Sequence, residues 1–157
     1  MAPTARWWSW MDLGTSPKEN EHVSEHEIIL PEGWPRPQGY SNGVVAPAGS
    51  RALHVAGQIA WDTERELVGA GDFAAQFAQA LDNVIAVVHA AGGEVAHVAS
   101  MTVYVTDKRQ YLDALQAVGA TWTSRCGKHF PAMALVEVAD LLEEGALVEL
   151  SAVAHLP

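Results

Sequence analysis

The sequence predicts an α+β fold in which two helices pack on one face of a mixed sheet. Two amphipathic helical segments and several short segments of alternating hydrophobicity support this class, in the order β-β-α-β-α-β-β. A chain of 157 residues is long enough to bury one core. Because two helices cannot cover both faces of such a sheet, we expect the other face to be apolar and to drive oligomerisation.

The first segment, residues 1–38, is predicted to be an extension outside the core. It is rich in Pro, Gly, Glu and His and has no sustained hydrophobic period. Trp7, Trp8 and Trp10 interrupt it, and such large apolar rings are expected to anchor the tail on the domain or on a neighbouring subunit. The domain itself is expected to span residues 39–157.

The first strands are expected at residues 42–45 and 51–61, with a turn at 47–50, and together they suggest a hairpin. Gly57 lies inside the second of these strands. An isolated glycine in a strand usually marks a bulge or the close approach of another group.

The clearest helix is expected at residues 72–91, where Asp72 is a suitable N-cap and Gly92 and Gly93 supply the stop. Its apolar residues repeat at helical spacing: Phe73, Phe77, Leu81, Val84, Val87 and Val88.

Alternation at residues 97–106 predicts the next strand. Asp107 is expected to cap a second helix, residues 108–124, with an apolar stripe of Tyr111, Leu115, Val118 and Trp122. Two strands follow, at 133–138 and 146–154, and one further short strand is expected near Leu67.

Composition and charge narrow the class of protein. Hydrophobic residues make up 49% of the chain and no apolar run approaches the roughly 20 residues that cross a bilayer, which predicts a soluble protein without membrane partners. The net charge of −10 argues against a nucleic-acid partner. No export signal is evident, and the single cysteine, Cys126, fits a reducing cytoplasm. Cys126 is either a nucleophile or an ordinary helix-end residue.

Motifs for metals and phosphates are weak. His22 and His26 are four residues apart, but their polar setting lacks the pattern of a zinc protease helix, so no metal site is predicted. The GAGD segment, residues 69–72, has no lysine for a phosphate, and no Gly-x-Ser-x-Gly elbow occurs.

Two glutamates in predicted strands, Glu137 and Glu149, are flanked by apolar residues. Each either faces water by alternation or is buried with a partner, and a buried carboxylate can act as a general acid or base.

Several segments resemble, in order and spacing, the Rid superfamily of reactive intermediate deaminases, also called YjgF-like proteins. They are GYSNGVV (39–45), HVAGQIAWD (54–62), ALDNVIAVVHAAG (80–92), VYVTD (103–107), PAMALVEVADL (131–141) and ALVELSAVA (146–154). The resemblance implies a chorismate-mutase-like fold, a homotrimer with small-molecule pockets between subunits, and hydrolysis of enamines and imines without a metal or organic cofactor.

Site residues implied by the resemblance divide into matches and departures. Tyr40, Gly57 and Leu135 match ligand-holding positions, and Glu149 matches the carboxylate that positions the attacking water. In the deaminating branch of the superfamily, the segment that corresponds to residues 131–134 reads Pro-Ala-Arg-Ser, and its arginine binds the substrate carboxylate. Met133 stands in that position.

Other departures from the pattern are expected to change the pocket further. Ala56 replaces a pocket serine, and Trp61 is expected to join Met133 in a more apolar cavity. Arg36 or Arg125 could supply the missing cation, although neither matches a ligand position of the family.

Two functions follow from this pattern. The first is a Rid-type hydrolase whose enamine or imine substrate is not chosen by a carboxylate clamp. The second is a trimeric homologue without turnover that binds a small ligand or protects other proteins, with Glu149 in a structural role. A ribonuclease role is disfavoured by the negative charge and the lack of a basic stripe.

Overall fold

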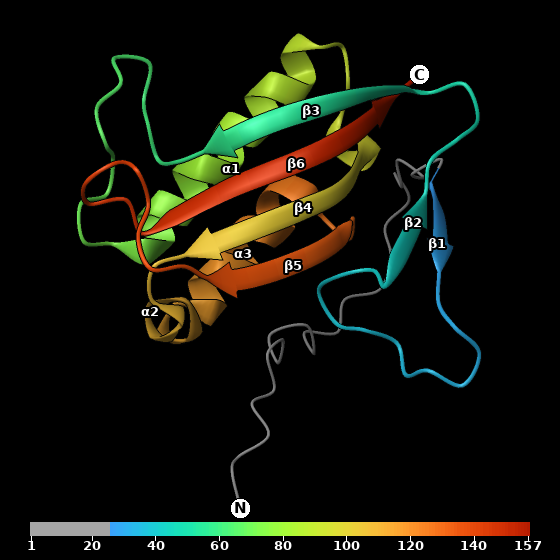
Figure 1. Ribbon diagram of the computed structural model, residues 1–157, viewed down its shortest axis with the longest axis horizontal. Coiled ribbons are helices and arrows are strands. Elements are labelled where there is room, and N and C mark those ends of the chain that lie inside the picture. The colour runs from blue at the N-terminus through green and yellow to red at the C-terminus, as the bar shows by residue number, and fades with distance from the viewer. Residues whose placement is uncertain (1–25) are drawn as a thin grey trace, which may run out of the picture.

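The computed structural model describes residues 26–157, and its centre is a four-stranded sheet (Figure 1). The strand order is β3-β6-β4-β5, with bounds Arg51–Gln58, Val148–Leu156, Val98–Val105 and Ala132–Glu137. β6 pairs antiparallel with β3 and β4, whereas β4 and β5 are parallel. The predicted mixed sheet is therefore confirmed. The tryptophan cluster and His22 lie outside the described residues.

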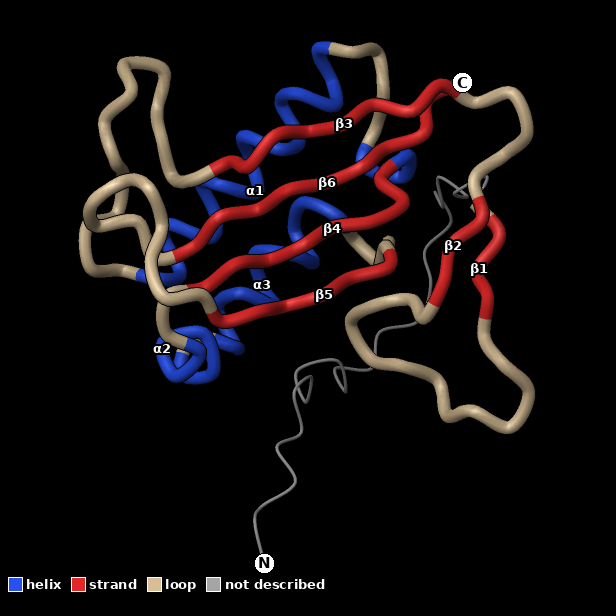
Figure 2. Tube along the Cα trace, viewed as in Figure 1, coloured by secondary structure: helices blue, strands red, loops and turns tan. Residues whose placement is uncertain are grey.

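The helices lie on one face of this sheet, as Figures 1 and 2 show. They are α1 (Phe73–Ala90), α2 (Lys108–Asp113) and α3 (Leu115–Cys126), with a short 3₁₀ turn, η2 (Val95–His97), before β4. The second predicted helix is thus divided at Ala114, whose φ of −90° and ψ of 2° leave the helical region. The α+β class and the single helical layer agree with the prediction.

Local capping explains where the helices begin. The Asp72 carboxylate accepts a hydrogen bond from the Ala75 amide at 3.1 Å, and Asp107 accepts one from the Arg109 amide at 2.8 Å. Each satisfies an amide that the first helical turn leaves without a backbone partner. Beyond α1, Gly92 has a φ of +82°, a conformation that favours glycine.

The core lies between the helices and the inner face of the sheet. Burial alternates strictly along β6, so every second residue from Val148 to Leu156 is buried. The predicted stripes supply the facing side chains, and Phe77, Val84 and Trp122 are at most 5% exposed. Helical and strand periods therefore converge on one apolar layer.

The first two strands form a separate ribbon. β1 (Glu27–Ile29) pairs antiparallel with β2 (Gly43–Val45), while β6 is the one partner of β3 among the described strands. The predicted hairpin between residues 42–45 and 51–61 is therefore wrong. A local turn signal identifies a turn but not the partner of the strand that follows. Here the long C-terminal strand satisfies the backbone of β3.

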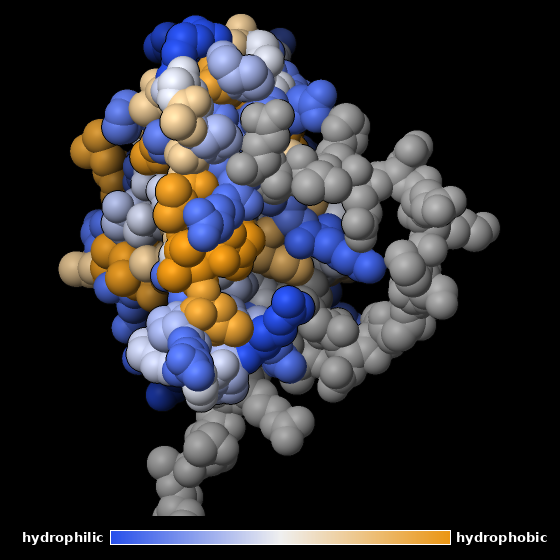
Figure 3. All heavy atoms as spheres, turned by 90° about the vertical axis from the view of Figure 1, so that its right-hand side faces the viewer, coloured by the Kyte–Doolittle hydropathy of each residue, from blue (hydrophilic) through white to orange (hydrophobic). Residues whose placement is uncertain are grey.

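Apolar side chains of the ribbon face solvent. Ile28 and Val45 in the strands are 52% and 49% exposed, and Trp34 in the loop that joins them is 59% exposed. Figure 3, which faces the side of the molecule where this ribbon lies, shows apolar side chains gathered there.

Two finer predictions can be compared with the strands. The pairing of β3 with β6 shifts register between Val55 and Gln58, the segment that contains Gly57, where a bulge or a close approach was expected. The short strand expected near Leu67 is reduced to one bridge, with Trp61. Within residues 26–157, no helix is long and apolar enough to cross a membrane.

Candidate functional site

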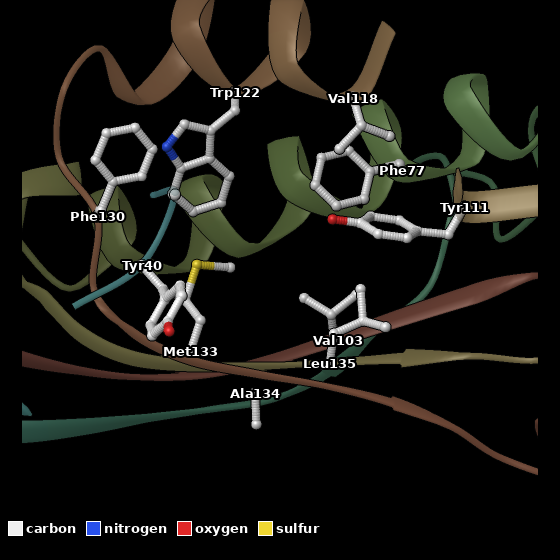
Figure 4. A pocket seen from close by; sticks show the side chains of 11 residues that line it. Tyr40, Phe77, Val103, Tyr111, Val118, Trp122, Phe130, Met133, Ala134 and Leu135 are labelled. Carbon is white, nitrogen blue, oxygen red and sulfur yellow. The ribbon is translucent and has the colours of Figure 1, made fainter. Parts of the chain in front are cut away.

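The N-terminal end of β5 lies beside the loop that carries Tyr40. Ser41 forms a parallel bridge with this strand, and its amide donates to the Pro131 carbonyl at 2.9 Å. Its hydroxyl donates to the Phe130 carbonyl at 2.6 Å. These contacts hold the loop against the strand, and Tyr40 consequently lies next to Met133 (Figure 4).

A cavity of about 210 Å³ lies between this strand and the helices. Three of the predicted substrate-binding residues, Tyr40, Met133 and Leu135, line it together. None of the lining residues in the described part of the chain carries a charge. The remaining lining residues are Gly39, Phe77, Val103, Tyr111, Val118, Trp122, Phe130 and Ala134. In Figure 4 the side chain of Ala134 points away from the others.

Two stacked rings form one wall of the cavity. The Trp122 and Phe130 rings are nearly parallel, at 10°, with centroids 6.1 Å apart. The indole N–H of Trp122 donates to the His129 carbonyl at 3.1 Å. Because that hydrogen bond satisfies its single donor, Trp122 presents aromatic carbon to the cavity.

His129 fastens this wall to the sheet. Its Nε2 lies 2.7 Å from the Val98 carbonyl oxygen, which requires a proton on that nitrogen. Burial lowers the pKa of His129 below its usual value, against the opposing effect of this hydrogen bond. The ring is therefore held in its neutral form.

Tyr111 brings a hydroxyl to the inner end of the cavity. The residue is 1% exposed, and its ring packs edge-on against Phe73, with centroids 6.0 Å apart. Burial raises the pKa of this phenol well above its usual value. In Figure 4 the hydroxyl points toward the middle of the lining residues, so the cavity contains a neutral phenol and not a phenolate.

Gly57 and Glu149 form a second group, at the junction of β3 and β6. A Cβ atom built on Gly57 would overlap the Glu149 carboxylate. Any side chain at position 57 would therefore have to displace this carboxylate. The glycine in this strand therefore allows the Glu149 carboxylate to approach the backbone closely.

The two groups lie on opposite faces of the sheet. Met133 pairs in register with Met101, and Met101 with Ala152, all on the helix side. Glu149 pairs with Tyr104 on the other side and is half-buried. Within one chain, the carboxylate and the cavity are therefore separated by the sheet.

Trp61 belongs to neither group. Its side chain is 40% exposed in the loop after β3 and does not line the cavity. Its backbone carbonyl accepts hydrogen bonds from the amide groups of Gln79 at 3.2 Å and Asn83 at 2.8 Å. These bonds hold the loop to α1, so the residue's observed contacts are structural.

The two arginines considered as replacement cations differ in their surroundings. Arg125 forms a two-pronged pair with Asp82, one prong of which joins Nη2 to Oδ2 at 2.9 Å. Arg36 is exposed and lines a neighbouring hollow of about 300 Å³, which shares Tyr40 with the cavity. Neither arginine lines the cavity that Met133 lines.

Two other candidate groups have structural explanations. Glu137 accepts a hydrogen bond from the Lys108 amide at 2.8 Å and therefore supports the start of α2. Cys126 is 8% exposed, and burial raises the pKa of its thiol to about 12. A buried protonated thiol is a poor nucleophile. Among the described residues, no group of three or more His, Cys, Asp or Glu side chains could hold a metal ion.

No sequence pattern identifies most of these residues as cavity-lining. Phe77, Val118 and Trp122 fall on helical apolar stripes, which predict burial. A stripe that fills the core and one that lines a cavity have the same period, so no sequence signal separates them.

The fold and these two groups define an α+β protein with an apolar pocket at an edge strand and a carboxylate on the open face. A family model described as Endoribonuclease L-PSP matches residues 35–156. The chain belongs to this family, within the YjgF/Rid superfamily.

The alignments with individual relatives cover nearly the whole length of each relative. A RutC family protein of Pyrococcus horikoshii is 32% identical over 130 residues, covering 82% of this chain and 97% of the relative. The 3-aminoacrylate deaminase RutC of Acinetobacter baylyi is 30% identical over 130 residues, covering 83% and 98%. The crystal structure of YyfB from Yersinia pestis, a Rid family protein of unknown function, aligns with a TM-score of 0.74 and 33% identity, covering 83% and 98%.

Proposed function

We propose that the protein is a Rid-type hydrolase that converts an enamine or imine to a carbonyl compound and ammonia, without selecting the substrate by a carboxylate clamp. The observation that carries this proposal is the placement of the Glu149 carboxylate over Gly57. Membership of a family that includes a 3-aminoacrylate deaminase supports the reaction type. The apolar cavity under Met133 supports the altered selectivity.

The proposed reaction is R₂C=NH + H₂O → R₂C=O + NH₃, and an enamine enters it after protonation at carbon. Glu149 accepts a proton from the attacking water as oxygen bonds to the imine carbon, and returns it to nitrogen to give the carbinolamine R₂C(OH)NH₂. Glu149 then transfers the hydroxyl proton to the amino nitrogen as the C–N bond breaks, which releases ammonia and leaves the carbonyl compound. Backbone groups near Gly57 and Leu135 hold the ligand, and Tyr40 closes the pocket.

A complete site on this proposal requires two copies of the chain. The carboxylate and the cavity of one chain face opposite ways, so Glu149 of one subunit serves the cavity of its neighbour in a cytoplasmic homotrimer. The open sheet face supports such an assembly, because it carries exposed Ala134 and Val136 instead of a covering layer.

The test is ammonia release from a panel of imines with and without a carboxylate. We expect Glu149→Ala to lower kcat/KM by at least about 100-fold, the lower range for loss of a general base. The control is Glu144→Ala, an exposed residue of the loop between β5 and β6. Equal losses in both variants, or no loss in either, would contradict a catalytic role for Glu149.

The alternative is a trimeric homologue that binds a small ligand or protects other proteins without turnover. The uncharged lining of the cavity favours it, because a carboxylated intermediate finds no cationic partner there. Absence of ammonia release from every imine, together with retention of ligand in the pocket, would establish this reading.

A further inference from the structure

The volume of the cavity lined by Met133 limits the size of the group that it can bind. A cavity of about 150 Å³ lined by aliphatic and aromatic side chains accommodates benzene. The cavity volume of about 210 Å³ therefore suits one aromatic ring with a short substituent.

The chemistry of the lining excludes a charged occupant from its depth. Among residues 26–157, no Lys, Arg, His, Asp or Glu side chain lines the cavity. Removing a carboxylate from water without a partner costs several kcal/mol or more, whereas a neutral ring gains from leaving water. The deep hydroxyl belongs to Tyr111, which burial keeps protonated and therefore uncharged.

The walls of the cavity are suited to contact the two faces of an aromatic ring. Trp122 and Phe130 provide a nearly parallel pair of aromatic surfaces, fastened through the carbonyl of His129. On the other side lies Met133, whose flexible thioether adapts to aromatic neighbours. In Figure 4, Trp122 from α3, Phe130 from the loop before β5 and Met133 from β5 converge on the same space.

We infer that the cavity between α3 and β5 binds an uncharged group the size of one aromatic ring, with the ring placed between Trp122 and Met133. This inference rests on the proposed function and names its substrate class, an imine or enamine that carries such a ring. The ring occupies the cavity, and the reactive carbon lies at the mouth beside Tyr40 and the backbone of Leu135.

The test uses two probes that differ only at one position of the ring, toluene and benzoate. The chain contains four methionines, and one of them, Met133, lines the cavity. Protein labelled with ¹³C at the methionine methyl groups reports ring binding through the shift of the Met133 resonance. Met133→Leu, which keeps an apolar side chain, assigns that resonance.

We expect toluene to shift the Met133 resonance saturably and to bind at least tenfold more tightly than benzoate. Val118→Phe, which fills the cavity, should abolish the shift; Leu135→Phe fills it from the strand side if the first variant fails to fold. The matched control is Leu142→Phe, at a fully exposed loop position, and it should bind as the native protein does. Benzoate binding as tight as toluene, or toluene binding that survives both filling variants, would overturn the inference.

Ammonia release distinguishes this inference from the proposed function. Saturable toluene binding without release from any imine would support the ring site while contradicting the hydrolase. Release from small imines without toluene binding would support the hydrolase and contradict the ring site.

Discussion

The two faces of the sheet present different kinds of site. Under the helices, a partly open apolar cavity arises from packing, and the described residues that line it are uncharged. On the open face, a carboxylate lies over a glycine at a strand bulge, and no described helix covers it. In the hydrolase proposed above, substrate selection and proton transfer therefore belong to opposite faces of one chain, and a variant on one face should leave the other face intact.

The largest effect is expected at the aromatic wall of the cavity. Trp122→Ala removes a buried indole and should lower the free energy of unfolding by about 3–5 kcal/mol. Denaturant titration measures the change. Trp34→Ala is the matched control, because that side chain is 59% exposed, and it should change stability by no more than about 0.5 kcal/mol. Similar losses in both variants would mean that the wall is not part of the core.

The next largest effect is expected from a substitution that changes only the open face of the sheet. Gly57→Ala should displace the Glu149 carboxylate, because the new Cβ occupies its space. We expect ammonia release to fall about 100-fold, comparable to loss of a general base, while toluene still shifts the Met133 resonance. If both ammonia release and toluene binding disappear, the two faces are not independent.

A smaller change should convert the selectivity of the cavity. Met133→Arg introduces a guanidinium where the lining is uncharged, and a charge-assisted hydrogen bond contributes about 1.5–3 kcal/mol. Turnover of 2-iminopropionate should therefore rise about 10- to 100-fold, measured as kcat/KM for ammonia release. An intact oligomer without any gain would show that the pocket differs at more than this position.

The smallest effect concerns pH. Burial lowers the pKa of His129 in the folded protein, so below the unfolded value of about 6.5 the unfolded chain binds more protons. Stability should therefore decline as the pH falls through about 6.5 toward the lower folded pKa. The difference between native protein and His129→Gln, measured by denaturation at pH 5 and pH 7.5, isolates this contribution. A difference that does not change with pH would contradict it.

Much of the fold could be predicted because its signals are local. Asp72 and Asp107 mark helix starts, and alternation along the strands separates the buried face from the exposed one. Strand pairing was harder to predict from the sequence: β2 pairs with β1 and not with β3. Strand partners depend on backbone hydrogen bonds between distant segments, which a turn signal does not specify.

The candidate site was predictable residue by residue but not as an arrangement. Tyr40, Met133 and Leu135 do line one cavity, whereas Trp61 lies outside it and Glu149 faces the other way. Whether these residues carry the roles implied by the family stays a prediction until the variants are measured.

By itself, the sequence determined the fold class, the family and the absence of an arginine at position 133, because each depends on residue type and local order. Only the tertiary structure decided that the helical stripe around Trp122 encloses a cavity, and that the bulge at Gly57 lies against Glu149. The physical reason is that cavities and close approaches depend on how distant segments pack, and the same residue pattern is compatible with a filled core.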